Sequence, residues 1–117
     1  MNFESVRQYA LSLEAVTEEP HHQYSSFRVR GKIFVTVPPG EEYLHVFVGE
    51  EVREPMLALY PEFLEKLFWG EKAQGLRVRL QAAQPEVVRS LLEKAYETRV
   101  NKDAKPGRPR RNPRVAE

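Results

Sequence analysis

Residues 27–34 read FRVRGKIF, and this stretch decides the fold because it has the pattern of a β-hairpin. Its first four residues alternate between an apolar and a basic side chain, which is the period of two expected of a half-buried strand. Gly31 and Lys32 are expected to form a tight turn, and residues 33–37 a β-branched returning strand. A connection this short joins only antiparallel strands, so the sheet around this hairpin is predicted to be antiparallel.

The rest of the chain extends this sheet and adds helices. Strand patterns recur in three further segments, which are residues 43–48, 63–69 and 76–80. Helical spacing marks residues 3–14, 50–60 and 85–99. Because Pro55 suits a first turn, the regular part of the middle helix is expected to begin near Glu54, and Pro61 to end it. Residues 15–23 are polar and are expected to form a loop. The order αβββαββα predicts an α+β fold of two layers, an antiparallel five-stranded sheet with helices packed on it.

The composition fits one domain and excludes several kinds of site. The chain has 117 residues, of which 41% are hydrophobic, and this is enough for one modest core. It has no cysteine, which excludes disulfides, thiol catalysis and cysteine-ligated metals. No apolar run approaches the roughly 18 residues of a membrane span, and residues 1–20 show no secretory signal, so a cytoplasmic protein without a membrane partner is expected. The abundance of Glu, Arg and Pro resembles thermophile usage.

The hairpin at residues 27–34 also resembles the FRVRGK-aromatic hairpin of the MmcQ/YjbR family. Three more segments resemble parts of that family in the same order, namely ALSL at 10–13, LRVRL at 76–80 and LLEKAY at 91–96. The resemblance implies an α/β fold comparable with CyaY-like proteins and secretion chaperones, and a DNA-binding function. It supplies no catalytic residue. The family often has an aromatic residue just before the last strand, where this chain has Ala73-Gln74-Gly75.

Charge is divided unequally along the chain. Residues 101–117 hold six Lys or Arg and two acidic residues, a net charge of +4. Residues 1–100 hold the other 12 basic and 15 acidic residues of the 18 and 17 in the chain, a net charge of −3. The folded domain is expected to end at Val100, and residues 101–117 to form a flexible basic arm that contacts a partner.

Residues 105–111 read KPGRPRR and resemble an AT-hook, whose core is Gly-Arg-Pro with basic flanks. Proline on both sides holds the chain narrow, glycine permits close backbone approach, and Arg108 can enter the narrow minor groove of A·T-rich DNA. Pro106 stands where the usual core has arginine, so the match is partial. General contact with nucleic acid and a solvated basic tail are the alternatives.

The sheet offers a second candidate surface on its face away from the helices. The residues expected to point toward the helices are Phe27, Val29, Leu76, Val78 and Leu80, with Leu44, Val46 and Val48. The aromatic and polar residues expected on the outer face are Phe34, Thr36, Tyr43, His45 and Phe47. Arginine mixed with aromatic rings suits stacking on single-stranded nucleic acid. Ordinary cross-strand pairing and a homodimer seam are the alternatives. Trp69 is expected to pack against a helix.

No metal site, cofactor or catalytic group is expected. His21 and His22 lie near Glu18 and Glu19, but adjacent histidines on a loop rarely point at one ion, and no third ligand at helical spacing is evident. No serine is placed with a base and an orienting acid, as nucleophilic catalysis requires.

The sequence therefore predicts a small non-enzymatic DNA-binding protein, with an A·T-rich duplex as its expected partner. The residues predicted to contact DNA are Lys105, Arg108, Arg110, Arg111 and Arg114 in the tail, followed by Arg28, Arg30, Arg77 and Arg79 on the sheet. The second hypothesis is a chaperone-like interaction module that binds a protein partner with the open sheet face. An enzyme is the weakest reading of the sequence.

Overall fold

The computed structural model describes residues 1–102 and divides them into three α-helices, six β-strands and one short 3-10 helix. The helices are α1 (Phe3–Ser12), α2 (Glu50–Leu59) and α3 (Pro85–Lys102). The strands are β1 (Val16–His21), β2 (Tyr24–Val29), β3 (Lys32–Val37), β4 (Tyr43–Val46), β5 (Leu64–Trp69) and β6 (Lys72–Arg79). The 3-10 helix η1 (Leu80–Ala82) follows β6 directly.

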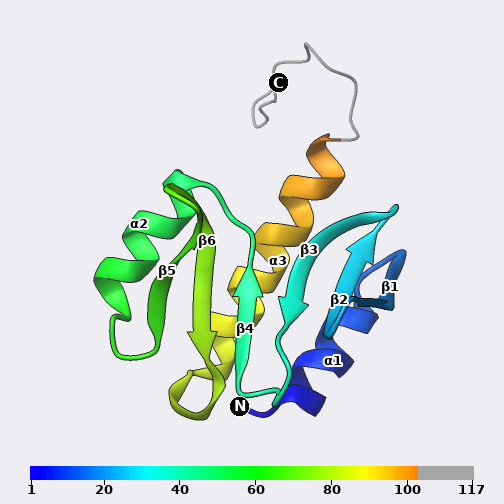
Figure 1. The fold of residues 1–117 in the computed structure, drawn as a ribbon, viewed down its shortest axis with the longest axis horizontal. Helices are drawn as coiled ribbons and strands as arrows, with labels where there is room; N and C mark the ends of the chain where they lie inside the picture. The colour runs from blue at the N-terminus through cyan, green and yellow to red at the C-terminus, as the bar shows by residue number, and fades with distance from the viewer. Residues whose placement is uncertain (103–117) are drawn as a thin grey trace.

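The six strands form one antiparallel sheet in the order β1-β2-β3-β4-β6-β5. Figure 1 shows α3 crossing behind the central strands, with α1 beside β1 and α2 beside β5. The helices therefore cover one face of the sheet. This arrangement confirms the predicted α+β fold, with six strands in place of five.

The core lies between α3 and the sheet. The residues that alternation places toward the helices are buried, namely Phe27, Val29, Leu76, Val78 and Leu80, with Leu44, Val46 and Val48. They share one cluster with fully buried residues of α3, which are Val88, Leu91, Leu92 and Ala95. These four positions recur every three or four residues, so they form a single apolar stripe along the helix. Each Val or Leu buried in this way contributes about 1.5–3 kcal/mol to folding.

The sixth strand, β1, occupies residues that were expected to form a loop. It pairs with β2 over its whole length, from Val16 opposite Val29 to His21 opposite Tyr24. Most of its side chains are exposed, so it lacks the apolar alternation that marks a half-buried strand. Pro20 lies within it, which an edge strand tolerates because one side of that strand donates no ladder hydrogen bonds. The prediction of a loop was wrong because this strand is specified by its hairpin pairing and not by burial.

Further boundaries differ from the sequence prediction: β6 begins at Lys72 and not at Leu76, and two others concern a turn and a helix. The turn after β2 consists of Arg30 and Gly31, with φ of 54° and 79°, and Lys32 already pairs with Val29. Two successive positive φ values are the mark of a type I′ turn, so Arg30 belongs to the turn and not to the outer face of the strand. α2 begins at Glu50 and not near Glu54, because Gly49 accepts hydrogen bonds from the first turn and Pro55 is accommodated inside the helix.

Phe34 faces the helices, although alternation predicted that it faces outward. The β2–β3 register shifts at this point, since Phe27 opposes Val35 while Arg28 opposes Ile33. Phe34 is therefore the extra residue of a β-bulge, which turns its side chain out of the alternating pattern. Its ring is fully buried and lies 5.8 Å from the ring of Tyr96 on α3.

Gly75 on β6 lies against the backbone of the neighbouring strand end, and it generates a test of the fold. A Cβ atom at Gly75 would overlap the carbonyl oxygen of Val46 and lie 3.0 Å from Cα of Phe47. We expect Gly75→Ala to lower the free energy of unfolding by about 1–3 kcal/mol, because overpacking against backbone cannot be relieved by a rotamer change. Urea denaturation measures the loss. Lys72→Ala, on the exposed end of the same strand, is the control and should stay within about 0.5 kcal/mol of the parent. A Gly75→Ala protein as stable as the control would contradict this packing.

Candidate nucleic-acid interface

The tail residues predicted to contact DNA lie outside the described part of the chain. These are Lys105, Arg108, Arg110, Arg111 and Arg114. The description ends with α3, whose last residue is Lys102. The position of that helix end therefore fixes where the tail leaves the domain.

The sheet arginines are each held by a local partner. Nε of Arg28 donates to Oγ of Ser26 at 3.1 Å and lies 3.9 Å from a carboxylate oxygen of Glu19. The guanidinium of Arg77 lies 3.8 Å from the ring centroid of Tyr43, a cation–π contact.

Arg77 also lies 3.7 Å from a carboxylate oxygen of Glu65, and Arg79 donates to the carbonyl oxygen of Glu62 at 3.3 Å. β3 and β4 separate Arg28 from Arg77 and Arg79, and Arg30 lies in the hairpin turn. The structure therefore does not gather these arginines into one cluster.

A row of polar residues crosses the outer face of the sheet. The backbone partners in this row, from β1 to β5, are Glu19, Ser26, Thr36, His45, Arg77 and Glu65. Ser26 is fully buried, and its hydroxyl donates to the carbonyl oxygen of Glu19 at 2.7 Å. The sequence correctly placed Thr36, His45 and Arg77 on this face, so the outer face is polar along its centre.

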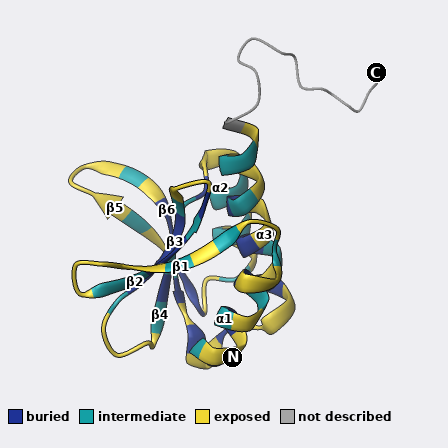
Figure 2. Cartoon of the chain, turned by 90° about the vertical axis from the view of Figure 1, so that its right-hand side faces the viewer, coloured by how far each residue is buried: buried dark blue, intermediate teal, exposed yellow. Residues whose placement is uncertain are grey.

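A groove lies across this face between two hairpins, and we call it the hairpin groove. In Figure 2 the β1–β2 and β5–β6 hairpins diverge on the side away from the helices. The cavity between them measures about 490 Å³. Its lining residues are His21, His22, Tyr24, Thr36, His45, Phe47, Leu67, Phe68, Trp69 and Gln74. They include all three histidines of the chain and no carboxylate.

Aromatic rings form one wall of the hairpin groove. Trp69 is 76% exposed and Phe68 is 56% exposed, so the expectation that Trp69 packs against a helix was wrong. Both lie at the end of β5, beyond the part of the sheet that the helices cover. Their exposure could be suspected only from the turn that follows at Gly70, because apolar side chains this close to a turn need not reach the core.

The hairpin groove continues toward the end of α3. The adjoining hollow shares His21, Thr36, Phe47 and Gln74 with it and is also lined by Arg99. Nε of Arg99 donates to the carbonyl oxygen of Ile33 at 2.8 Å, which holds this α3 side chain against the sheet. The groove therefore runs from the two hairpin tips to the last turns of the helix that precedes the tail.

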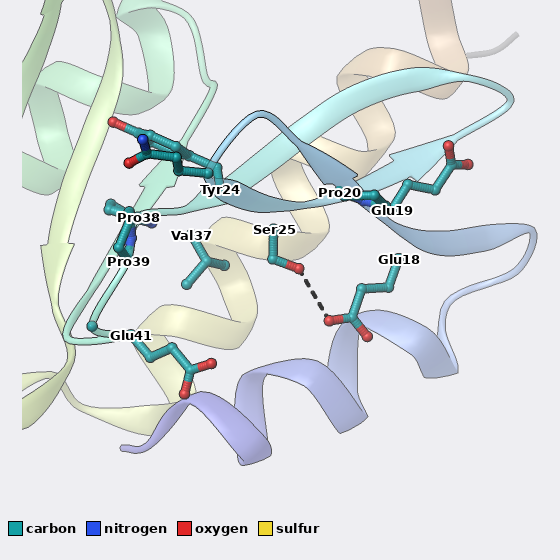
Figure 3. A pocket seen from close by; sticks show the side chains of 11 residues that line it. Glu18, Glu19, Pro20, Tyr24, Ser25, Val37, Pro38, Pro39 and Glu41 are labelled. Carbon is teal, nitrogen blue, oxygen red and sulfur yellow. Dashed lines mark hydrogen bonds between the residues drawn. The ribbon is translucent and has the colours of Figure 1, made fainter.

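A second pocket, of about 550 Å³, has the opposite electrostatic character. Figure 3 shows Glu18, Glu19 and Glu41 around it, with Ser25 donating to Glu18. Glu18 also accepts from Nε of Arg7 at 2.6 Å. A pocket with three carboxylates in its lining repels phosphate, so this side of the molecule does not suit nucleic acid.

Neither a metal centre nor a membrane span emerges from residues 1–102. Within that range no three His, Cys, Asp or Glu side chains are grouped as a metal ion requires. The rings of His21 and His22 contact each other with centroids 4.8 Å apart and planes tilted by 57°. No helix in the same range is long and apolar enough to cross a membrane.

Comparison with known proteins identifies one family and one similar structure. The YjbR family model matches residues 11–98. The crystal structure of Deinococcus radiodurans protein DR2400, with the family-model domain DUF419, superposes with a TM-score of 0.77. The match covers 90% of this chain and 83% of that one at 17% sequence identity, which supports the fold alone. No curated protein matches the chain.

His45, which lines the hairpin groove, makes the stability of the fold depend on pH. Burial lowers the pKa of His45, and the positive charge of Arg77 lowers it further. The unfolded chain, with an ordinary histidine pKa of about 6.5, therefore binds a proton at a higher pH than the folded protein does. The contribution of the buried neutral imidazole to folding stability is therefore complete above the pKa of the unfolded chain. It is lost as the pH falls below that value toward the lower pKa of the folded protein.

We accordingly expect the free energy of unfolding to decrease between about pH 7.5 and about pH 5.5, and His45→Gln to flatten this part of the profile. Urea denaturation at a series of pH values measures the slope. Gln74→Ala changes a neighbouring side chain that does not titrate, so it should keep the parental slope. An unchanged slope in His45→Gln would contradict the assignment to this histidine.

Proposed function

The chain belongs to the YjbR family, and we propose that it is a small non-enzymatic DNA-binding protein of the cytoplasm. The division of charge along the chain carries this proposal, since a tail of net charge +4 follows a body of net charge −3. DNA attracts such a tail because each phosphate contact by Lys or Arg releases condensed counterions. The Gly107-Arg108-Pro109 core adds a preference for the narrow minor groove of A·T-rich duplexes.

The tail supplies most of the affinity in this proposal. Lys105, Arg108, Arg110, Arg111 and Arg114 contact phosphate and minor groove. Arg28, Arg30, Arg77 and Arg79 contribute less. Arg77 would give up its contacts with Tyr43 and Glu65 in order to bind phosphate. Exchanging one charged partner for another yields little net free energy at a solvated surface.

The position of the end of α3 supports a single DNA-facing side. α3 ends at Lys102, soon after Arg99, which lines the hollow that adjoins the hairpin groove. The lining of that groove contains no carboxylate, whereas Glu18, Glu19 and Glu41 line a neighbouring pocket that shares only Tyr24 with it. DNA held by the tail is therefore directed to the outer face of the sheet and away from the acidic pocket.

A protein-interaction module is the second candidate function, and one observation favours it. Trp69 and Phe68 are exposed side by side at the end of an edge strand. Exposed aromatic side chains beside a free strand edge suit the docking of an extended peptide. Binding of that kind depends on apolar contact, so it would change little with salt concentration.

Fluorescence anisotropy with labelled A·T-rich and G·C-rich duplexes tests the DNA-binding proposal. Five phosphate contacts at about −0.9 each give an expected log–log salt slope of about −4 to −5 for the full chain. Arg108→Gln/Arg110→Gln should make that slope shallower by about 2 and remove the preference for A·T. The control is Arg89→Gln/Lys94→Gln, which removes the same charge from exposed positions of α3 and should change neither property.

Absence of binding to both duplexes at low salt would contradict the proposal. An equal effect of the tail variant and the α3 variant would also contradict it, because net charge and not the tail would then determine affinity. Salt-insensitive binding to a protein partner would instead favour the interaction module.

A further inference from the structure

We propose that the hairpin groove binds unpaired bases of single-stranded DNA. This inference rests on the proposed DNA-binding function and deepens it, because it names the form of DNA that the folded domain takes. A duplex presents its bases only as edges in the grooves, whereas unpaired bases offer whole faces for stacking. The hairpin groove is hollow and lined with rings, so it matches the second kind of ligand.

The size of the hairpin groove suits a base. Its volume of about 490 Å³ falls within the range of roughly 300–1,000 Å³ typical of small-ligand sites. Its floor consists of Thr36, His45 and Phe47, and its walls come from the tips of two hairpins. A base can therefore lie between the walls while its sugar and phosphate stay at the open side.

The walls offer faces for stacking. Trp69 and Phe68 stand on the β5–β6 hairpin, and Tyr24 stands on the β1–β2 hairpin across the groove. The ring of Tyr24 lies 6.0 Å from that of His45, which places a second ring at the floor. Because Trp69 is 76% exposed, folding buries little of its apolar surface. A base stacked on its ring would bury apolar surface that the domain leaves in water.

The hairpin groove also contains hydrogen-bonding groups that match the edges of bases. The hydroxyl of Thr36 and the amide of Gln74 each donate and accept. Burial lowers the pKa of His45 and so favours its neutral imidazole, which presents one donor and one acceptor. Unpaired bases expose the same mixture of donors and acceptors, so the groove can satisfy them without a charged contact.

Charge distinguishes this groove from the other hollows. Residues 1–100 carry 15 acidic side chains, yet none lines the hairpin groove or the adjoining hollow that ends at Arg99. The pocket near α1 is lined by three glutamates. A phosphate backbone can therefore follow these two hollows from the hairpin tips to Arg99.

Trp69 makes the proposal directly measurable, because it is the only tryptophan in the chain. Its intrinsic fluorescence should be quenched to saturation when the full chain is titrated with single-stranded oligothymidine of about 12 nucleotides, a length within the usual site size. Blunt duplex of the same length should bind without comparable quenching.

Phe68→Ala tests the stacking wall without disturbing the core, since Phe68 is 56% exposed. The expected result is a loss of about fivefold or more in affinity for oligothymidine, as for the loss of one stacked base, with duplex affinity within about twofold of the parent. Leu59→Ala is the matched control, because Leu59 is 65% exposed but lies on α2 and lines none of the hollows described above. It should change neither affinity.

The outcomes separate this proposal from the one on which it rests. If duplex binds but oligothymidine leaves Trp69 fluorescence unchanged, the hairpin groove is not a base site and the DNA-binding tail still stands. If neither binds, both proposals fail. If Phe68→Ala weakens duplex and oligothymidine equally, or no more than Leu59→Ala does, the stacking role is overturned.

Discussion

The packing of α3 across one face of the sheet is the interaction on which the rest of the structure depends. A single apolar stripe on this helix meets the inward residues of the strands, and no helix covers the opposite face in residues 1–102. The side chains on that face must be compatible with water, while the strands keep their backbone hydrogen bonds. Polar residues along its centre meet this requirement, because Ser26 donates to a backbone carbonyl and Arg77 stacks on Tyr43. The open face is therefore a consequence of where the helix lies.

Two local departures from regular strand geometry shape the hairpin groove on that open face. The bulge at Phe34 removes a large ring from the outer face and adds it to the core beside Tyr96. The missing side chain at Gly75 lets β6 approach the backbone at Val46 and Phe47. Phe47 and Gln74, which flank these contacts, then line the middle of the groove.

The sequence predicted those parts of the fold in which burial alternates with exposure. The alternation in LRVRL predicted which residues of β6 face inward and outward. The same alternation in FRVR predicted β2 as the hairpin partner of β3. β1 was missed because an exposed edge strand has no apolar period, and Phe34 was misplaced because a bulge depends on register between two strands. The outward direction of Arg28, Arg77 and Arg79 was predictable. Their partners were not, because pairing across strands needs the register of the whole sheet.

Electrostatics then decides which surface a polyanion can use. A body of net charge −3 repels DNA within about a Debye length, roughly 8–10 Å at ordinary salt. A basic tail overcomes that repulsion only if the surface beside its attachment point carries few carboxylates. The end of α3 meets this condition on one side, where Arg99 lines the carboxylate-free hollow that adjoins the hairpin groove, whereas Glu50 shares a second hollow with Arg99. The separation of charge along the chain is thus matched, beside the end of α3, by one hollow whose lining carries no carboxylate.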